Sequence, residues 1–307
     1  MKLQRQQIGK VLTAYTYIAP FFLLFFAFGL FPILYSLFLS FTYWKGMGKQ
    51  IFVAFDNYKA LLQDQTFYKA LYNTAFIWIA AHLIILPGGF LLAFLLNTEY
   101  VRRKNFFQAL FFTPVVTSSI AVSLVFSTMF GEQFGVLNFL LESLGLPAVT
   151  WFHGDGRWLK PVIILLFSWR WIGWNMVIYF AGMQGIDTEL YECAAVEGAN
   201  KAQILGRITL PLMKPVILYT LVLSFIGGIQ IFDEPFILTG GGITYIGGAN
   251  QAGLTLATQL YEVGFRTGNM GTASALAYII MAIIGALSAF SIRMFARERA
   301  TRRGDRA

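Results

Sequence analysis

The chain is poor in charged residues and has a single cysteine. Asp, Glu, Lys and Arg make up 12% of its 307 residues, whereas 57% are hydrophobic and 17% are aromatic. This composition lies far outside that of ordinary soluble domains. The lone Cys193 excludes an intrachain disulfide, and we expect it to be a small buried residue in a reducing compartment. The composition therefore predicts a membrane protein.

Motifs for nucleotide binding, catalysis and metal binding are also missing. Gly48 and Lys49 are followed by Gln50, and no glycine lies five residues before Gly48, so no phosphate-binding loop is present. The apolar runs hold no Ser/His/Asp set and no cluster of metal ligands. His82 stands alone, and we expect it to make a helix-packing hydrogen bond. We predict that the chain is no enzyme and binds no metal or cofactor itself.

Long uncharged runs indicate transmembrane helices, each of which needs about 20 residues. Four such runs are Val11–Trp44, Ala70–Thr98, Asn105–Gly131 and Thr267–Ile292. Two further candidates carry charges: Pro161–Met183 contains Arg170, and Pro215–Leu238 contains Asp233 and Glu234. A β-barrel would show alternating segments of about ten residues instead. The sequence predicts an all-α membrane protein of six transmembrane helices, forming a single domain over residues 1–307.

The basic residues predict the orientation in the membrane, because cytoplasmic loops carry an excess of Lys and Arg. Three clusters fall on one side of a six-helix topology: Lys2, Arg5 and Lys10; Arg102, Arg103 and Lys104; and Arg293, Arg297, Arg299, Arg302, Arg303 and Arg306. Both termini are therefore expected in the cytoplasm, and residues 45–69, 132–160 and 239–266 outside. The net charge of +8 is explained by this topology, and we expect no nucleic-acid partner.

A polar segment, residues 187–215, interrupts the apolar runs on the predicted cytoplasmic side. Asp187 or Thr188 can cap a first helix, and Gly198 can end it because glycine accepts a left-handed backbone. Asn200 and Gln203 have the spacing of a second cap, and we expect Pro211 to end the second helix. From spacing alone, an ordinary loop folded on its own helices and a docking surface for another protein both stay open.

This segment is similar to the loop signature of permease subunits in bacterial ABC importers that are fed by solute-binding proteins. The matching positions are Glu192, Ala194, Gly198, Ala199, Ile208, Leu210 and Pro211. The sequence departs from the usual pattern at Cys193, Glu197 and Leu205, each with a residue of similar size or charge. Three further stretches resemble the carbohydrate-uptake branch of this family, the maltose and glycerol-3-phosphate permease-like proteins. They are WIGWNMVIYFAGMQGIDTELYE (171–192), FDEPFILTGGG (232–242) and GNMGTASALAYII (268–280).

The resemblance implies the type I importer fold in the bacterial inner membrane and a sugar or oligosaccharide as cargo. It implies that the chain forms half of the pathway with a second homologous permease, and that an extracytoplasmic sugar-binding protein delivers the cargo. A cytoplasmic ATPase dimer would hold ATP and Mg and dock on the coupling loop. The residues implied in this contact are Glu192, Ala194, Ala195, Glu197, Gly198 and Ala199.

Polar residues inside the apolar runs are the candidates for a cargo path, because a charge at mid-bilayer is costly and normally faces protein or water. The candidates are Arg170, Trp171, Trp174, Asn175, Asp233 and Glu234. Four of them share one helical face at positions 170–175, where indoles and an amide suit a sugar.

Alternatives to this cargo path stay open. Arg170 can instead pair with Asp233 or Glu234 and join two helices, with the tryptophans in an interfacial belt. A non-sugar solute is a possible cargo, and an ion-gradient transporter is a further alternative, in which the intramembrane charges would couple ions to transport.

Overall fold

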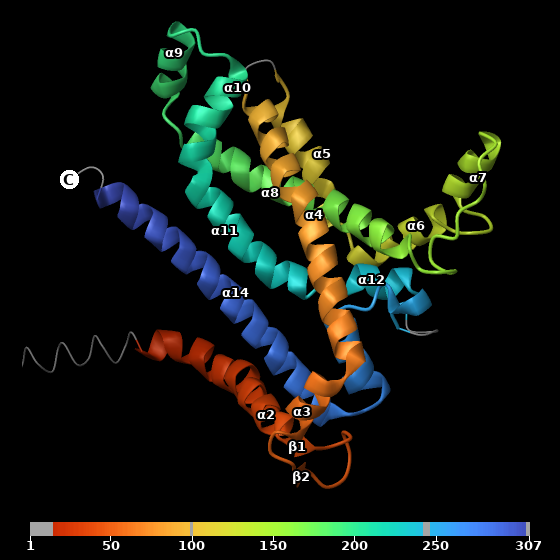
Figure 1. The fold of residues 1–307 in the computed structure, drawn as a ribbon. Helices are drawn as coiled ribbons and strands as arrows, with labels where there is room; N and C mark the ends of the chain where they lie inside the picture. Colours follow the sequence, from red (N-terminus) through yellow and green to blue (C-terminus); the bar gives the residue numbers. More distant parts are fainter. Residues whose placement is uncertain (1–14, 99–100, 242–245, 305–307) are drawn as a thin grey trace, which may run out of the picture. The chain divides into compact units, whose positions relative to one another are not determined.

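The protein is built almost entirely of helices (Figure 1). The computed structural model describes residues 15–98, 101–241 and 246–304, with side chains up to residue 293. The predicted positions Lys2, Arg5, Lys10, Gly242 and Arg306 lie outside the described residues. The predicted all-α membrane fold is confirmed by these helices.

The described α-helices follow one another along the chain with short connections. They are α2 (Phe31–Ser40), α3 (Asp56–Gln63), α4 (Gln65–Asn97), α5 (Lys104–Val116), α6 (Ser119–Met129), α7 (Val136–Ser143), α8 (Leu159–Gln184), α9 (Thr188–Val196), α10 (Lys201–Ile204), α11 (Leu210–Ile229), α12 (Asp233–Leu238), α13 (Leu256–Tyr261) and α14 (Met270–Gly304). The other elements are the π-helical turns η1 (Phe25–Leu30), η2 (Leu205–Thr209) and η4 (Glu262–Arg266), the 3-10 turn η3 (Ala249–Gln251), and the antiparallel strands β1 (Thr42–Tyr43) and β2 (Ile51–Phe52).

Within the described residues, five helical stretches are long and apolar enough to cross a membrane: Tyr15–Ser40, Gln65–Asn97, Leu159–Gln184, Lys201–Leu238 and Met270–Arg293. A sixth is obtained when the bent pair α5–α6 is counted as one crossing. Each stretch overlaps one of the runs expected from the sequence. The short helices α3 and α7 fall in the segments 45–69 and 132–160 that were predicted outside the membrane.

The third run differs from the expected straight helix over 105–131. It forms two helices that meet at 89°, because Thr117 is extended and Ser118 starts a new helix as its N-cap. The Ser118 hydroxyl accepts a hydrogen bond from the N–H of Ala121 at 3.5 Å. Side-chain capping compensates the N–H groups that such a break leaves without helical partners.

Pro211 does not end the second helix of segment 187–215, contrary to expectation. The helix widens into η2, where the N–H of Leu210 bonds to the C=O of Leu205, and continues as α11 with Pro211 in its first turn. The π-helical turn just before Pro211 accommodates the proline, whose ring and missing N–H would disturb a regular α-helix.

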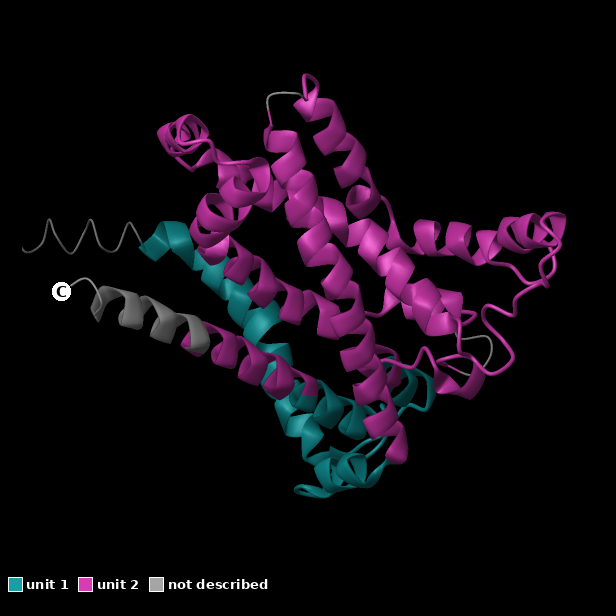
Figure 2. Cartoon of the chain, turned by 45° about the horizontal axis from the view of Figure 1, so that its top comes forward, with its two compact units in different colours: residues 1–64, 260–279 teal, residues 65–259, 280–307 magenta. Residues whose placement is uncertain are grey.

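The chain divides into two compact units, residues 1–64 with 260–279 and residues 65–259 with 280–307 (Figure 2). In the first unit, Asn57 is buried and ties three segments together. Its amide donates to the C=O groups of Ser40 and Thr42, both at 2.9 Å, and its carbonyl accepts from the hydroxyl of Thr272 at 3.1 Å. One amide thus joins the end of α2, strand β1 and the beginning of α14.

The second unit is built around the contact between α4 and α8. Ile77 and Ile85 of α4 and Leu166 of α8 are fully buried in one apolar cluster. Also on α8, Gly173 lies so close to α5 that a Cβ there would come 1.8 Å from the carbonyl oxygen of Phe111. A small residue at this position permits close helix packing, as is common in membranes.

Residues 246–255 are largely non-helical, yet several of them are buried in the second unit. Asn73 of α4 donates to the C=O groups of Gln251 and Leu254, both at 2.9 Å, and the Thr74 hydroxyl accepts from the N–H of Leu256 at 2.9 Å. Buried backbone polar groups require such partners. Two adjacent polar side chains of α4 therefore fix the path of this segment.

Candidate functional site

A buried ion pair joins α8 to α12. Nη1 of Arg170 lies 2.5 Å from Oε1 of Glu234, and the two side chains are 8% and 5% exposed. Either charge alone would be costly to bury, so each requires the other. The structure therefore contains the helix-joining pair that the sequence left open as an alternative role for Arg170.

The same charges reach the bend of the third membrane run. Nη2 of Arg170 donates to the C=O of Thr117 at 3.4 Å, and the Ser119 hydroxyl donates to the carboxylate of Asp233. Side chains of α8 and α12 thus form hydrogen bonds at the break, one with the backbone of Thr117 and one with Ser119, the first residue of α6. The bend is supported by side chains far away in the sequence.

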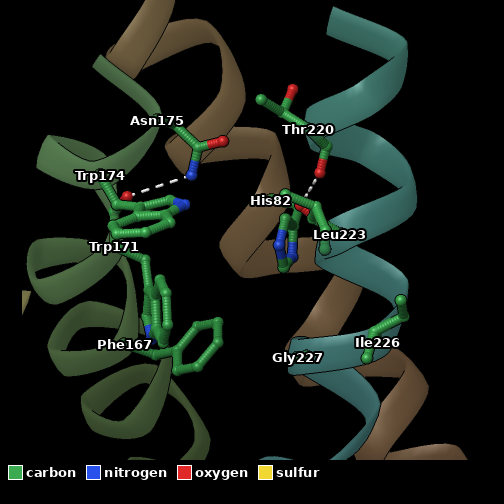
Figure 3. Close-up of a pocket in the computed structure, with 11 residues that line it drawn as sticks. His82, Phe167, Trp171, Trp174, Asn175, Thr220, Leu223, Ile226 and Gly227 are labelled. Atoms are coloured by element: carbon green, nitrogen blue, oxygen red, sulfur yellow. Dashed lines mark hydrogen bonds between the residues drawn. The ribbon is translucent and has the colours of Figure 1, made fainter. Parts of the chain in front are cut away.

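An apolar cavity of about 260 Å³ lies between α4, α8 and α11 (Figure 3). Three of the predicted cargo-path residues, Trp171, Trp174 and Asn175, line it. Arg170 does not, and lines a second cavity together with Asp233 and Glu234. Trp171 lines this second cavity as well, so the six predicted residues are distributed over two neighbouring cavities that share one of them.

The other walls of the apolar cavity were not foreseen from the sequence. His82 comes from α4, and Thr220, Ser224 and Gly227 come from α11. His82 Nδ1 lies 2.8 Å from the C=O of Trp78, so its hydrogen bond stays within α4 instead of joining two helices. Only the packing of three helices brings these residues together, and no local spacing signals it.

Segment 187–215 forms two capped helices around a glycine corner, as predicted. Asp187 caps α9 by accepting from the N–H of Glu189 at 3.1 Å. Gly198 has φ of +78°, and the N–H of Ala199 bonds back to the C=O of Ala194 at 2.9 Å. Asn200 and Gln203 make both hydrogen bonds of a capping box, at 2.8 and 2.9 Å.

The corner presents most of its side chains outward. Of the residues predicted to couple to an ATPase, Glu192, Ala195, Glu197 and Gly198 are exposed, Ala199 is half-buried and Ala194 is buried. Cys193 is exposed, contrary to the expectation of a buried residue. Two exposed apolar side chains were missed: Leu190 is 46% and Val196 is 89% exposed. An apolar tip flanked by acids is typical of a surface that another protein covers.

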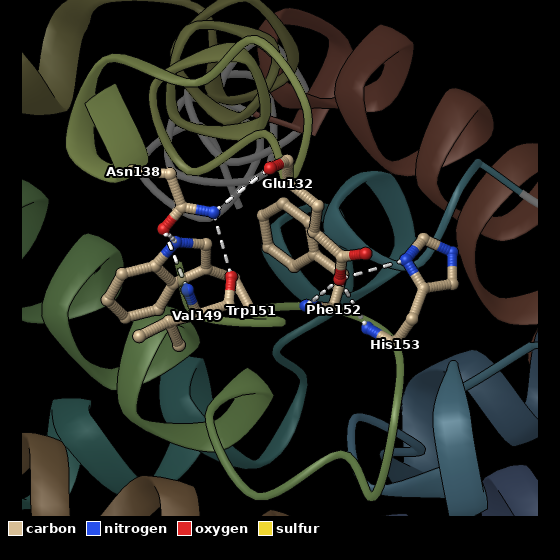
Figure 4. Close-up of polar contacts among 6 residues, drawn as sticks. All are labelled: Glu132, Asn138, Val149, Trp151, Phe152 and His153. Atoms are coloured by element: carbon tan, nitrogen blue, oxygen red, sulfur yellow. Dashed lines mark hydrogen bonds and ion pairs between the residues drawn. The ribbon is translucent and has the colours of Figure 1, made fainter. Parts of the chain in front are cut away.

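A polar network fixes the loop after α7 (Figure 4). Oε1 of Glu132 accepts from the N–H groups of Phe152 at 3.1 Å and His153 at 2.9 Å. The Asn138 amide donates to the C=O groups of Glu132 and Val149, and its carbonyl accepts from the indole of Trp151 at 2.9 Å.

The charge of Glu132 depends on this network. Burial acts to raise the pKa of Glu132, but the hydrogen bonds from His153 and Phe152 outweigh it and lower the pKa below its ordinary value. The ionised carboxylate is therefore the form that holds the loop.

Comparison with known proteins places these features in a family. The model of the family described as binding-protein-dependent transport system inner membrane component matches residues 85–300, which include segment 187–215 and, apart from His82, the residues that line both cavities. The chain belongs to this family. It is therefore a multi-pass membrane permease, and the family description makes a binding protein part of the transport system.

Individual permeases are similar over nearly the whole chain. The arabinooligosaccharides transport system permease protein of Bacillus subtilis (strain 168) is 35% identical over 287 residues, 93% of this chain and 89% of that protein. The lactose transport system permease protein of Rhizobium radiobacter is 34% identical over 275 residues, 89% and 90% of the two chains. A bacterial ABC transporter that imports the acidic polysaccharide alginate has a solved chain with a TM-score of 0.84 and 25% identity, covering 97% of this permease and 99% of that chain.

We predict that the Arg170–Glu234 pair specifies the packing of α8 on α12. Arg170→Ala or Glu234→Ala leaves one buried charge unpaired, which costs about 3–5 kcal/mol. The double variant Arg170→Met with Glu234→Leu removes both charges and should recover most of the lost stability. Thermal unfolding of the purified protein measures this.

Arg157→Ala provides the control for the ion pair, because Arg157 pairs with Asp155 at 2.8 Å on an exposed loop of the same unit. It should unfold like the wild type. A double variant that is no more stable than the single variants would contradict the assignment.

We predict that acid releases the loop held by Glu132. Because its folded pKa is lowered, its contribution is complete above the unfolded value of about 4.3 and is lost as the pH falls through the lower folded value. The difference in thermal stability between wild type and Glu132→Gln should shrink over this range. Glu142→Gln, on exposed α7, is the matched control. A difference that does not change with pH would argue against the network.

Proposed function

We propose that this permease is the transmembrane subunit of an ATP-driven sugar or oligosaccharide importer. It forms half of the translocation pathway with a second homologous permease, receives its cargo from an extracytoplasmic sugar-binding protein, and is driven by a cytoplasmic ATPase pair. The names of its relatives support the cargo, since the two curated permeases serve arabinooligosaccharides and lactose and the structural neighbour imports alginate. Residues 1–307 act as one membrane domain in this proposal.

The apolar cavity is the observation that supports sugar cargo within this chain. The indoles of Trp171 and Trp174 stand at its wall with their centroids 6.3 Å apart. The Asn175 amide donates to the C=O of Trp171 at 3.1 Å, so its carbonyl can accept from a ligand. Sugar ring faces pack on aromatic rings, and sugar hydroxyls need a few placed polar groups.

The exposed corner around Gly198 supports docking on an ATPase. Leu190 and Val196 offer apolar side chains, Glu192 and Glu197 offer charge, and the caps on both sides hold the corner in shape. ATP and Mg would be held by the partner, because the sequence has no phosphate-binding loop. The permease itself would then bind no cofactor and catalyse no reaction.

The arrangement of the second unit supports a cytoplasmic position for the corner, and the basic residues near the two ends of the sequence favour the same side for both termini. Lys104, beside the basic pair Arg102 and Arg103, lines one depression together with Glu192 and Asn97. Segment 187–215 therefore lies at the same end of the unit as a basic cluster, and such clusters stay in the cytoplasm. The network around Glu132 would face outward, together with the loops that meet the binding protein.

We predict that Gly198→Asp and Glu192→Lys abolish sugar uptake. The first strains a left-handed backbone by about 1–2 kcal/mol and distorts the corner, and the second reverses a charge on the docking surface. Uptake by whole cells measures the effect, while sugar binding by the isolated binding protein stays unchanged.

Gly145→Asp is the matched control for the strained glycine. Gly145 has φ of +74° and open space like Gly198, but it follows α7 at the other end of the unit. This variant should transport. Normal uptake in both corner variants would refute the coupling role.

We predict that Trp174→Ala weakens sugar transport by removing one stacking face. A loss of about 0.5–1.5 kcal/mol corresponds to a fall of roughly twofold to tenfold in uptake at low sugar concentration. Trp169→Ala is the control, because Trp169 is a similarly exposed indole on α8 that does not line the cavity. Equal effects of the two variants would contradict the cargo site.

A further inference from the structure

Two cavities of the second unit share one wall. The apolar cavity of about 260 Å³ and a smaller cavity of about 250 Å³ are both lined by Phe167, Trp171 and Gly227. The smaller cavity is otherwise lined by Ser119, Gln230 and the charged residues of the ion-pair network, together with the apolar Ile231 and Phe232. The three shared residues therefore separate a polar compartment from an aromatic one.

The shared wall has two aromatic side chains on α8 and a glycine without a side chain on α11. Trp171 and Phe167 come from α8, one helical turn apart, with ring centroids 6.0 Å apart. They face α11 at Gly227 (Figure 3), where an added Cβ would meet nothing within 4 Å. A passage between the cavities would therefore be bounded by two aromatic side chains on α8, and a larger residue at position 227 could narrow it without a clash at its Cβ.

The wall also carries hydrogen-bond donors that the protein leaves unpaired. Among the described residues, the buried Nε1 of Trp171 and Nε of the adjacent Arg170 have no hydrogen-bond partner. A buried N–H without an acceptor is unfavourable. A hydroxyl oxygen of a polyol that passes between the compartments would supply the missing acceptor.

We propose that Trp171 is the residue that controls passage between the two compartments and selects for cargo with hydroxyl acceptors. The inference rests on the proposed sugar import. A sugar first meets the polar compartment beside the bend of α5 and α6, and then passes Trp171 to stack in the aromatic cavity. Rotation of the indole opens the passage, and its N–H binds the sugar during the crossing.

Thiol labelling tests this proposal without requiring transport. The sole cysteine is removed by Cys193→Ala, and reporters are introduced as Ser224→Cys in the aromatic cavity or Gln230→Cys in the polar one. The assembled importer in sealed vesicles is treated with a small membrane-impermeant methanethiosulfonate. In the parent, the reporter at position 224 should react at least about tenfold more slowly than the reporter at position 230.

Variants that widen or narrow the passage should change the ratio of the labelling rates at positions 224 and 230 in opposite directions. Trp171→Ala should accelerate labelling at position 224 by about tenfold, and Gly227→Leu should slow it by a similar factor. Neither should change labelling at position 230 by more than about twofold. Gly285→Leu, at an exposed glycine of α14 whose Cβ would also meet nothing within 4 Å, should leave both rates unchanged.

The outcomes separate this inference from the proposed function. If Trp171→Ala fails to assemble, Gly227→Leu carries the test alone, and an unchanged rate at position 224 overturns the proposal. An unchanged ratio in an assembled Trp171→Ala importer overturns it as well. Labelling of position 230 from the cytoplasmic side only would refute the proposed topology but leave the role of Trp171 to be decided by the same ratio.

Discussion

Every backbone N–H and C=O inside a bilayer needs a partner within the protein, and this constraint governs where the permease can interrupt its helices. Long helices meet it by themselves, but each break exposes backbone groups. At the bend of the third run the partners are Ser118 and Arg170. The same need applies to backbone buried in the protein outside the bilayer, and in residues 246–255 the partners are Asn73 and Thr74. At the exposed glycine corner, Asn200 and its capping box provide partners as well. Each break is thus held by named side chains.

The break between α5 and α6 also lies beside a cavity and the buried ion pair. The polar cavity lies beside the bend, because Ser119 and the residues that serve the bend also line it. A buried ion pair contributes little net stability compared with apolar packing, but it specifies one arrangement of the helices that carry it. We infer that Arg170 and Glu234 fix α8 on α12 and thereby fix the position of Trp171, the next residue along α8.

The features that the sequence predicts are local ones. Uncharged runs predict the membrane helices because length and polarity alone decide whether a segment can cross. Gly198, Asn200 and Gln203 predict the corner because capping acts over three or four residues. The bend at Thr117 was missed, because a straight helix and a broken one can have the same uncharged composition. The cavity walls from His82 and Thr220 were missed because they depend on packing between helices far apart in the chain.

The central claim is that the capped corner at Gly198 faces the cytoplasm and is covered there by the ATPase. Its native reporter is Cys193, the only cysteine of the chain, which is exposed on α9. An impermeant maleimide added to sealed vesicles tests the claim directly. Cys193 should react in inside-out vesicles stripped of the ATPase, stay unlabelled in right-side-out vesicles, and become protected when the ATPase is restored. Labelling in right-side-out vesicles, or equal labelling with and without the ATPase, would contradict it.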